Sequence, residues 1–150
     1  MYSDWYSGYY NVSDHRYIHY LMILSEYKPL EDPVIVYFNG GPGAASIENA
    51  FSGLGPVFMR ESGPERFNFT WTKNATLIFV DNPAGVGFSY ARRPADNIHS
   101  DFSYQRDALT FMIKLFADNT ELRDNPLYIC GISYGGLYAP YLTWALHQYN

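Results

Sequence analysis

The sequence predicts an α/β fold in which a mostly parallel β-sheet is flanked by helices. Three short apolar runs, rich in β-branched and aromatic residues, have the character of strands buried on both faces of a sheet. Elsewhere the apolar residues recur with a period near 3.6, which indicates amphipathic helices. Buried strands that alternate with helices are typical of a parallel sheet whose crossovers cover its faces.

The first half of the chain supplies two expected strands. Apolar residues alternate with their neighbours over 18–24, which predicts a strand, and two prolines within 28–33 predict a turn. Val34–Phe38 is the first buried run, and the Gly- and Pro-rich segment 39–43 must form a loop after it. A second buried run at 76–80 is ended by the turn residues of 81–85.

A helix that lies on the sheet is predicted over 101–118, with Ser100 or Asp101 as its cap. The third buried run is 127–130, whose Cys130 has no second cysteine to pair with and is expected to be a small buried hydrophobe. A last helix is predicted over 134–149, kinked or delayed by Pro140. The apolar residues expected on the sheet-facing side of the first helix are Phe102, Leu109, Met112, Ile113 and Phe116.

Length and composition limit the classes of function. The chain has 150 residues, the usual size of one domain, and its 47% hydrophobic content allows a packed core. A net charge of −5 without any run of Lys or Arg argues against nucleic-acid binding. No apolar stretch approaches the ~18 residues of a membrane span. No cofactor or metal is implied.

The first residues carry neither a basic region nor an apolar segment, so no signal peptide is visible. Asn-x-Ser/Thr triplets nevertheless begin at Asn11, Asn68 and Asn74. These triplets matter only for a chain that enters the secretory pathway.

The most informative motif is Gly-x-Ser-x-Gly at 131–135, directly after the third apolar run. In this pattern the serine lies on a sharp strand-to-helix turn, and the two glycines allow backbone to approach backbone. Ser133 is therefore a candidate nucleophile, with the backbone N–H of Tyr134 as an oxyanion donor. The alternative interpretation is an ordinary strand-to-helix turn.

The loop at 39–43 is the candidate source of a second oxyanion donor, because it follows a buried strand and its glycines permit close approach. It is also compatible with a simple Gly/Pro turn. A dinucleotide-binding loop is disfavoured, since the third glycine of that pattern and the later acidic residue are absent.

Four segments together carry a resemblance to the serine carboxypeptidase family. They are Tyr-Ser-Gly-Tyr at 6–9, Asn-Gly-Gly-Pro-Gly at 39–43, Leu-Ile-Phe-Val-Asp-Asn-Pro-Ala-Gly-Val-Gly-Phe-Ser-Tyr at 77–90, and Gly-Ile-Ser-Tyr-Gly-Gly at 131–136. The resemblance covers nearly the whole chain. It implies a partial α/β-hydrolase fold, with residues 1–150 as the N-terminal part of the domain and with the later strands and cap missing. It also implies a secreted, vacuolar or lysosomal setting.

The resemblance also implies roles for individual residues. Ser133 resembles the nucleophile that releases C-terminal amino acids from peptides. Gly41 and Tyr134 resemble the oxyanion donors, while Asn39 and Gly40 resemble the groups that hold the terminal carboxylate of a peptide substrate. Tyr37, where the family has Trp, is placed with them in the substrate site.

The sequence departs from the family pattern at three other positions. Ile132 replaces the Glu before the nucleophile, Gly53 aligns with a second Glu, and Ala44 replaces a disulfide cysteine. The two missing acids help to grip the terminal carboxylate in the family. An acyltransferase or esterase of the same fold therefore remains an alternative.

The sequence after Ser133 lacks the rest of a catalytic triad. It contains no Asp or Glu, and its one histidine, His147, would lie ~21 Å along a regular helix. A serine hydroxyl is a poor nucleophile without a base. We therefore expect the chain alone to have little activity, either as the N-terminal portion of an enzyme or as a non-catalytic binding remnant.

Overall fold

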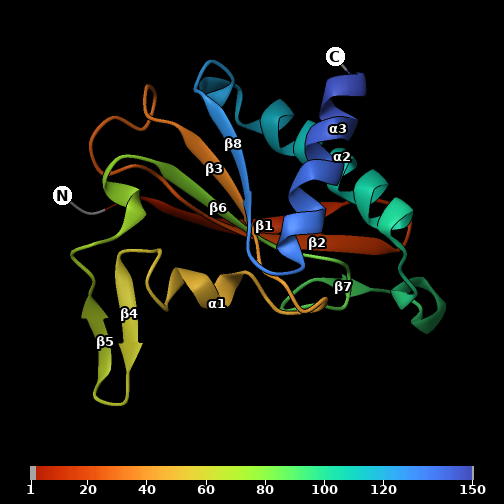
Figure 1. Ribbon diagram of the computed structural model, residues 1–150, viewed down its shortest axis with the longest axis horizontal. Coiled ribbons are helices and arrows are strands. Elements are labelled where there is room, and N and C mark those ends of the chain that lie inside the picture. The colour runs from red at the N-terminus through yellow and green to blue at the C-terminus, as the bar shows by residue number, and fades with distance from the viewer. Residues whose placement is uncertain (1–2, 150) are drawn as a thin grey trace.

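The computed structural model describes residues 3–149 and shows a central sheet between two layers of other elements (Figure 1). The sheet has the order β1-β2-β6-β3-β8, with β7 pairing to β2. Its strands are β1 (Trp5–Asn11), β2 (Arg16–Ile23), β3 (Val34–Phe38), β6 (Thr76–Asp81), β7 (Tyr90–Ala91) and β8 (Leu127–Gly131). The remaining elements are the hairpin β4 (Val57–Arg60) and β5 (Gly63–Arg66), the helices α1 (Ile47–Ala50), α2 (Asp101–Asp118) and α3 (Gly135–Tyr149), and the 3-10 turns η1 (Trp71–Lys73), η2 (Pro94–Asn97) and η3 (Thr120–Leu122).

The sheet is mixed, so the prediction of a mostly parallel sheet is wrong. β3 runs parallel to β6 and β8, whereas β2 is antiparallel to β1, β6 and β7. The physical reason lies in the connections: a short link joins β1 to β2, and only a long crossover can place consecutive strands parallel. The N-terminal strand β1 had no clear alternation of apolar residues and was not predicted.

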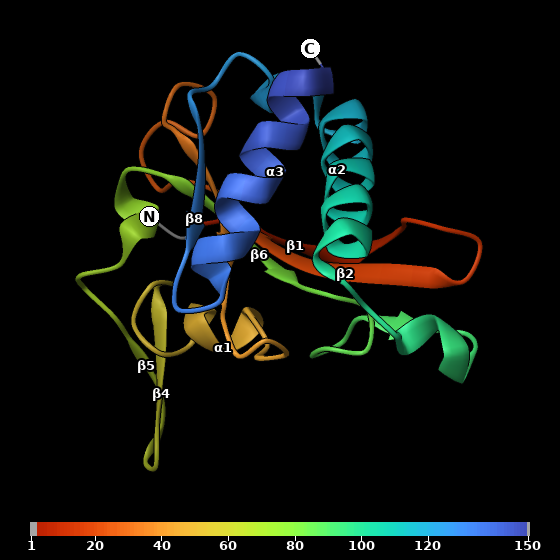
Figure 2. The ribbon, with the colours of Figure 1, turned by 45° about the vertical axis from the view of Figure 1, so that its right-hand side comes forward.

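The two faces of the sheet carry separate cores. Alternate residues of the central strands, such as Val36, Phe38 and Ile78, pack against α2 and α3, which lie side by side on one face (Figure 2). The intervening residues, such as Tyr37 and Phe79, pack against the short helix α1 on the other face. The period-2 alternation of strands therefore decides which side chains reach which layer.

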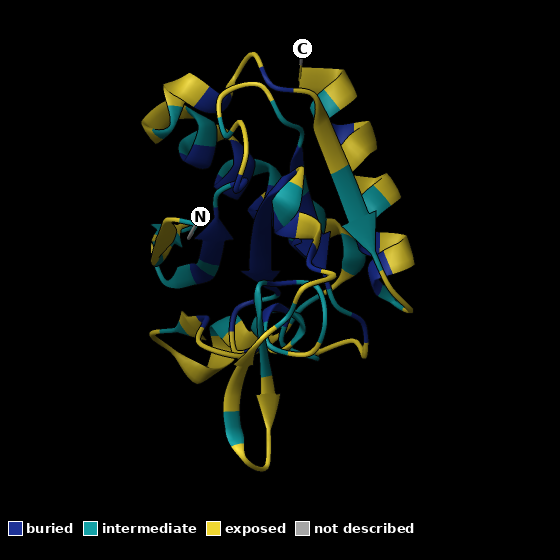
Figure 3. Ribbon diagram, turned by 90° about the vertical axis from the view of Figure 1, so that its left-hand side faces the viewer, coloured by how far each residue is buried: buried dark blue, intermediate teal, exposed yellow. Residues whose placement is uncertain are grey.

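The two central strands are buried as predicted, but β8 is not. Every residue of β6 is buried, and Figure 3 shows the dark blue central strands between yellow outer surfaces. In β8, Leu127 is 41% and Tyr128 60% exposed, and Cys130 is only half-buried. Within residues 3–149, β8 has β3 as its single neighbour, so its other edge is unpaired.

Helix α2 has the predicted bounds, and Ser100 caps it through a hydrogen bond to the backbone N–H of Ser103. Its buried face differs from the prediction, since Phe102 is 82% and Ile113 36% exposed. The residues of α2 that are buried are Tyr104, Asp107, Ala108, Phe111, Met112 and Leu115. Helix α3 begins at Gly135, so Pro140 lies inside the helix and does not delay its start.

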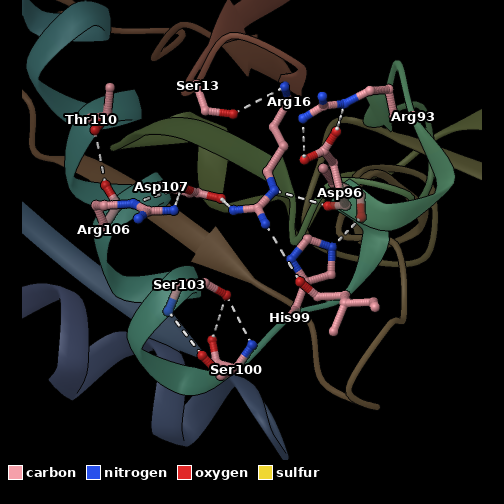
Figure 4. A network of polar contacts seen from close by, with 12 residues as sticks. Ser13, Arg16, Arg93, Asp96, His99, Ser100, Ser103, Arg106, Asp107 and Thr110 are labelled. Atoms are coloured by element: carbon pink, nitrogen blue, oxygen red, sulfur yellow. Dashed lines mark hydrogen bonds and ion pairs between the residues drawn. The ribbon is translucent and has the colours of Figure 1, made fainter.

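The buried face of α2 includes a charged residue, Asp107, which forms an ion pair with a residue of β2. Asp107 is 1% exposed and pairs with Arg16 of β2 at 2.9 Å (Figure 4). Arg16 also donates hydrogen bonds to the backbone oxygens of Asp96 and Ile98, and so connects strand, helix and the segment between them. Over the part of the chain that the structure describes, no helix has the length and apolar character needed to cross a membrane.

Candidate active site

Ser133 lies on the turn between β8 and α3, as predicted. Its φ is +55°, and it is the single non-glycine residue with positive φ among those the structure describes. A left-handed backbone is disfavoured for residues with a Cβ and is often found where a side chain must be presented for chemistry. Ser133 is exposed, so its hydroxyl is accessible from solvent.

The two glycines of the motif are required by close approach of the backbone. A Cβ on Gly131 would lie 2.0 Å from the backbone oxygen of Gly135, and one on Gly135 would lie 2.5 Å from the oxygen of Phe38. Both distances are far below contact range. The prediction that these glycines permit a tight elbow is therefore confirmed.

The loop at 39–46 packs directly against this elbow. A Cβ on Gly40 would lie 2.7 Å from the Cβ of Ser133 and 2.9 Å from the nitrogen of Tyr134. The loop is held by its own hydrogen bonds: the backbone N–H of Asn39 donates to Ser46 Oγ, and Asn39 Nδ2 donates to the oxygen of Ala45. The structure thus brings together two segments nearly a hundred residues apart in sequence.

The backbone N–H groups near Ser133 are not equivalent. The N–H of Gly40 donates to Asn39 Oδ1 at 2.9 Å and is therefore already used. No described residue accepts a hydrogen bond from the N–H of Gly41 or of Tyr134. Both predicted oxyanion donors are thus without an acceptor among the described residues.

The side chain of Tyr134 anchors the elbow to a second element. Its hydroxyl donates a hydrogen bond of 3.1 Å to Asp101 at the start of α2. This hydrogen bond, aided by partial loss of solvent, raises the pKa of Tyr134 above its usual value. The ring also meets Tyr138 edge to face, with centroids 5.3 Å apart. Tyr134, whose backbone N–H is a predicted oxyanion donor, is therefore fixed through both its hydroxyl and its ring.

The sequence profile of the family described as "Serine carboxypeptidase" matches residues 2–150. The chain belongs to the serine carboxypeptidase family. This membership confirms the resemblance seen in the sequence, including the order of its four segments.

Relatives in the serine carboxypeptidase family are much longer than this chain. It is 35% identical over 150 residues to "Serine carboxypeptidase 1" of Hordeum vulgare, covering 94% of this chain and 30% of that protein. It is 34% identical over 147 residues to the "Lysosomal protective protein" of Mus musculus, covering 95% of this chain and 30% of that protein. The chain thus spans about 30% of the length of these relatives.

The fold agrees with that of a solved carboxypeptidase. The structure of Kex1(delta)p, a prohormone-processing carboxypeptidase from Saccharomyces cerevisiae, superposes with a TM-score of 0.86. The match covers 99% of this chain and 35% of that chain at 20% identity. At this identity the likeness establishes the α/β fold of a partial domain and nothing finer.

Tyr37 and Ile132 differ in their exposure to solvent. Tyr37 is 4% exposed and stacks edge to face on Phe79, so the structure places it in the core beneath the loop, not at the surface of the site. Burial raises the pKa of Tyr37. Ile132 is 53% exposed and presents an apolar surface next to Ser133 in the chain.

None of the described histidines forms a hydrogen bond with Ser133. His147 is exposed near the far end of α3, as predicted for a surface residue. His99 donates from Nε2 to the oxygen of Ala84, and His19 contacts Asp81. Over residues 3–149, no group of three or more His, Cys, Asp and Glu side chains is arranged to hold a metal ion.

Sequence reasoning assigned no role to Asp81 and His19, which the structure brings together below the 39–46 loop. One signal was available in the sequence. Asp81 directly follows a fully apolar run, and a carboxylate at the end of a buried strand needs partners to offset its lost hydration.

Proposed function

We propose that this chain carries the nucleophile and oxyanion groups of a serine-type hydrolase that releases C-terminal amino acids from peptides. The observation that supports it best is the combination at the elbow. An exposed serine with φ +55° adjoins a glycine loop, and the N–H groups of Gly41 and Tyr134 have no acceptor among the described residues. Membership of the serine carboxypeptidase family supports the choice of substrate.

In the proposed reaction, Ser133 Oγ attacks the carbonyl carbon of the last peptide bond, and its proton passes to a base. The carbonyl oxygen becomes an oxyanion that accepts hydrogen bonds from the N–H groups of Gly41 and Tyr134. Collapse of this intermediate breaks the C–N bond, and the departing amine takes a proton. Water then hydrolyses the acyl-serine and regenerates the hydroxyl.

We propose that the base and its orienting acid come from outside this chain. The sequence after Ser133 has no Asp or Glu, and none of the described histidines is hydrogen-bonded to Ser133. Without a base, an enzyme of this type loses most of its rate. The 150-residue chain alone is therefore expected to turn over peptides no faster than its S133A variant.

A direct test begins with the coding sequence beyond codon 150, which is expected to encode an Asp followed by a His. The longer product should cleave a blocked dipeptide with a free C-terminus, and the S133A variant should not. The same dipeptide with an amidated C-terminus is the matched substrate control. Absence of Ser133-dependent cleavage in the longer product would overturn the proposal.

A second candidate is ester hydrolysis or acyl transfer by the same serine. The observation that favours it is Ile132, 53% exposed beside Ser133 where the family pattern has a Glu that grips a terminal carboxylate. The apolar side chain of Ile132 has no atom that can form a hydrogen bond with the terminal carboxyl group of a peptide. A higher kcat/KM for an ester than for the matching peptide would favour this candidate.

The non-catalytic alternative is a binding remnant. A fluorophosphonate probe separates it from an enzyme, because covalent labelling needs an activated serine. Labelling of the longer product that is no faster than labelling of its S133A variant would support a remnant.

We propose a secretory-pathway setting for the protein. The asparagines of all three Asn-x-Ser/Thr triplets are exposed, so the acceptor amides are accessible. A relative bears the name "Lysosomal protective protein". Expression with a leader in animal cells, followed by glycosidase treatment, should produce a mobility shift that N11Q, N68Q and N74Q together abolish.

A further inference from the structure

A buried carboxylate lies directly under the loop that faces Ser133. Asp81, the last residue of β6, is 0% exposed. Its Oδ1 accepts the backbone N–H of Ile47 at 3.1 Å, and its Oδ2 accepts the backbone N–H of Phe88 at 3.2 Å. The backbone of Gly87 closes over the same group, because a Cβ there would lie 2.4 Å from Oδ2.

The third partner of this carboxylate is His19 of β2, which is 4% exposed. Its Nδ1 lies 3.0 Å from Asp81 Oδ2. An ionised carboxylate can only accept hydrogen bonds, so Nδ1 carries the hydrogen. The other ring nitrogen then faces Ser7 Oγ at 3.4 Å.

Two aromatic rings and a serine pack around the pair of His19 and Asp81. The rings of Tyr9 on β1 and of Phe88 contact the imidazole of His19, with centroids 5.2 and 5.1 Å away. Ser89 Oγ accepts the backbone N–H of His19 and donates to the backbone oxygen of Asp81. Among the ion pairs of the described residues, His19 is the one partner of the Asp81 carboxylate.

The contact with Ile47 connects Asp81 to the elbow. Ile47 is the first residue of α1 and follows the 39–46 loop. Its neighbour Ser46 accepts the N–H of Asn39 and so joins the end of the loop to its start. Between these anchors lies Gly40, which packs on Ser133. Ile47 is thus joined through a short hydrogen-bonded loop to the backbone that packs on Ser133.

We propose that Asp81 is a positioning residue for this site: its carboxylate, oriented by His19, holds Ile47 and thereby keeps the 39–41 backbone in place against Ser133. The proposal deepens the proposed function and rests on it for its catalytic meaning. Packing alone does not account for the arrangement, because an apolar side chain would fill the space without the cost of burying a charge. The carboxylate is useful for its several hydrogen bonds to separate backbone segments.

The test compares two isosteric changes in the 150-residue chain. Asp81→Asn turns one acceptor oxygen into a donor that opposes its partners. Asp107→Asn makes the same change in a carboxylate of similar burial on α2. Amide resonances and hydrogen exchange are followed by ¹H–¹⁵N NMR, with melting curves for both variants. This measurement needs no turnover, so its failure is distinct from a failure of the proposed function.

In D81N, the amide exchange of Ile47 and Gly40 should rise at least about tenfold, and the resonances of Gly41 and Tyr134 should shift. In D107N these amides should keep their resonances although the chain melts at a lower temperature. Unchanged loop amides in D81N, or equal changes in both variants, would overturn the proposal.

A second pair of variants covers the case in which D81N fails to fold. His19→Gln keeps an N–H donor for Asp81, whereas His19→Phe removes it. The glutamine should preserve the Ile47 and Gly40 amides, and the phenylalanine should perturb them. Equal effects of both changes would contradict the proposed role.

Discussion

Two buried aspartates serve different regions of the molecule by different means. Asp107 lies at the interface of α2 and β2 and is compensated by arginines, with Arg16 at 2.9 Å and Arg106 at 3.4 Å. Asp81 lies at the site end of β6 and is bound by backbone N–H groups and a histidine. A carboxylate paired with arginine joins whole elements, whereas one bound to backbone amides sets the conformation of loops. The helix layer is thus held by an ion pair between side chains, whereas at the site a side chain holds backbone segments.

The largest expected effect is on the helix side of this comparison. Asp107→Ala leaves Arg16, whose side chain is 12% exposed, without its buried partner and should cost about 3–5 kcal/mol of unfolding free energy. Urea unfolding measures it. The control is Arg106→Ala, since that side chain is 66% exposed and its pairing should contribute at most about 1 kcal/mol. Similar losses of unfolding free energy in D107A and R106A would contradict the larger contribution expected from the buried ion pair.

On the site side, the decisive contacts are between backbone segments. Gly131→Ala would place a Cβ 2.0 Å from the oxygen of Gly135 and should cost about 1–3 kcal/mol. Gly136→Ala is the matched control in the same turn, because nothing lies within 4 Å of its Cβ. In helix α3 that change should stabilise the chain by up to about 1 kcal/mol. Opposite signs in thermal unfolding are expected, and a neutral G131A would show that the elbow can relax.

A smaller effect is expected where the two regions meet. Tyr134→Phe removes the hydrogen bond from the elbow to Asp101 on α2 and should cost about 0.5–1.5 kcal/mol. Tyr141→Phe is the control, since no described residue is hydrogen-bonded to that hydroxyl. Denaturant melts of the two variants provide the measurement. If Y134F and Y141F are equally stable, the side chain of Tyr134 does not anchor the elbow.

The smallest effect is a pH dependence at His99, beside the Arg16 network. Burial lowers the pKa of His99 more than its hydrogen bond to Ala84 raises it, and Arg16 acts in the same direction as burial. The unfolded chain therefore binds this proton more readily than the folded chain. Stability should fall as pH drops through the unfolded histidine pKa of about 6.5 toward the lower folded value. H99Q should flatten this slope in melts across that window, and an unchanged slope would contradict the assignment.

The sequence predicted where strands and helices lie in the chain better than it predicted which of their faces are buried. Strands over 34–38 and 76–80 follow from continuous apolar runs and the helix over 101–118 from a 3.6-residue apolar period, which neighbouring residues alone specify. The buried face of that helix was mispredicted, because Asp107 is buried and Phe102 exposed. A partner 91 residues away, Arg16, makes the difference, and no local pattern reveals it.

At the candidate site, too, local features were predicted and features formed by distant residues were not. Ser133 and its flanking glycines were predicted because the turn imposes its requirements locally, within five residues. The N–H of Tyr134 was expected from the Gly-x-Ser-x-Gly motif itself and the second donor from the loop at 39–43, whereas Gly41 in particular was named only through the family resemblance. The buried run at 34–38 had already predicted a core position for Tyr37, and only its assignment to the substrate site came from the resemblance. The junction of Asp81 with His19 and Ile47 was missed, because it forms only when β2 pairs with β6 and α1 packs beside β6.

By itself, the sequence determined the family and the main buried strands and helices, and it predicted Ser133 as the nucleophile, since each depends on residue types at short fixed spacings. The tertiary structure alone decided that the sheet is mixed, which faces are buried, and that a carboxylate on β6 supports the loop facing Ser133. Those features arise when strands far apart in the chain pair at ~4.8 Å and bring otherwise unrelated side chains into hydrogen-bonding range.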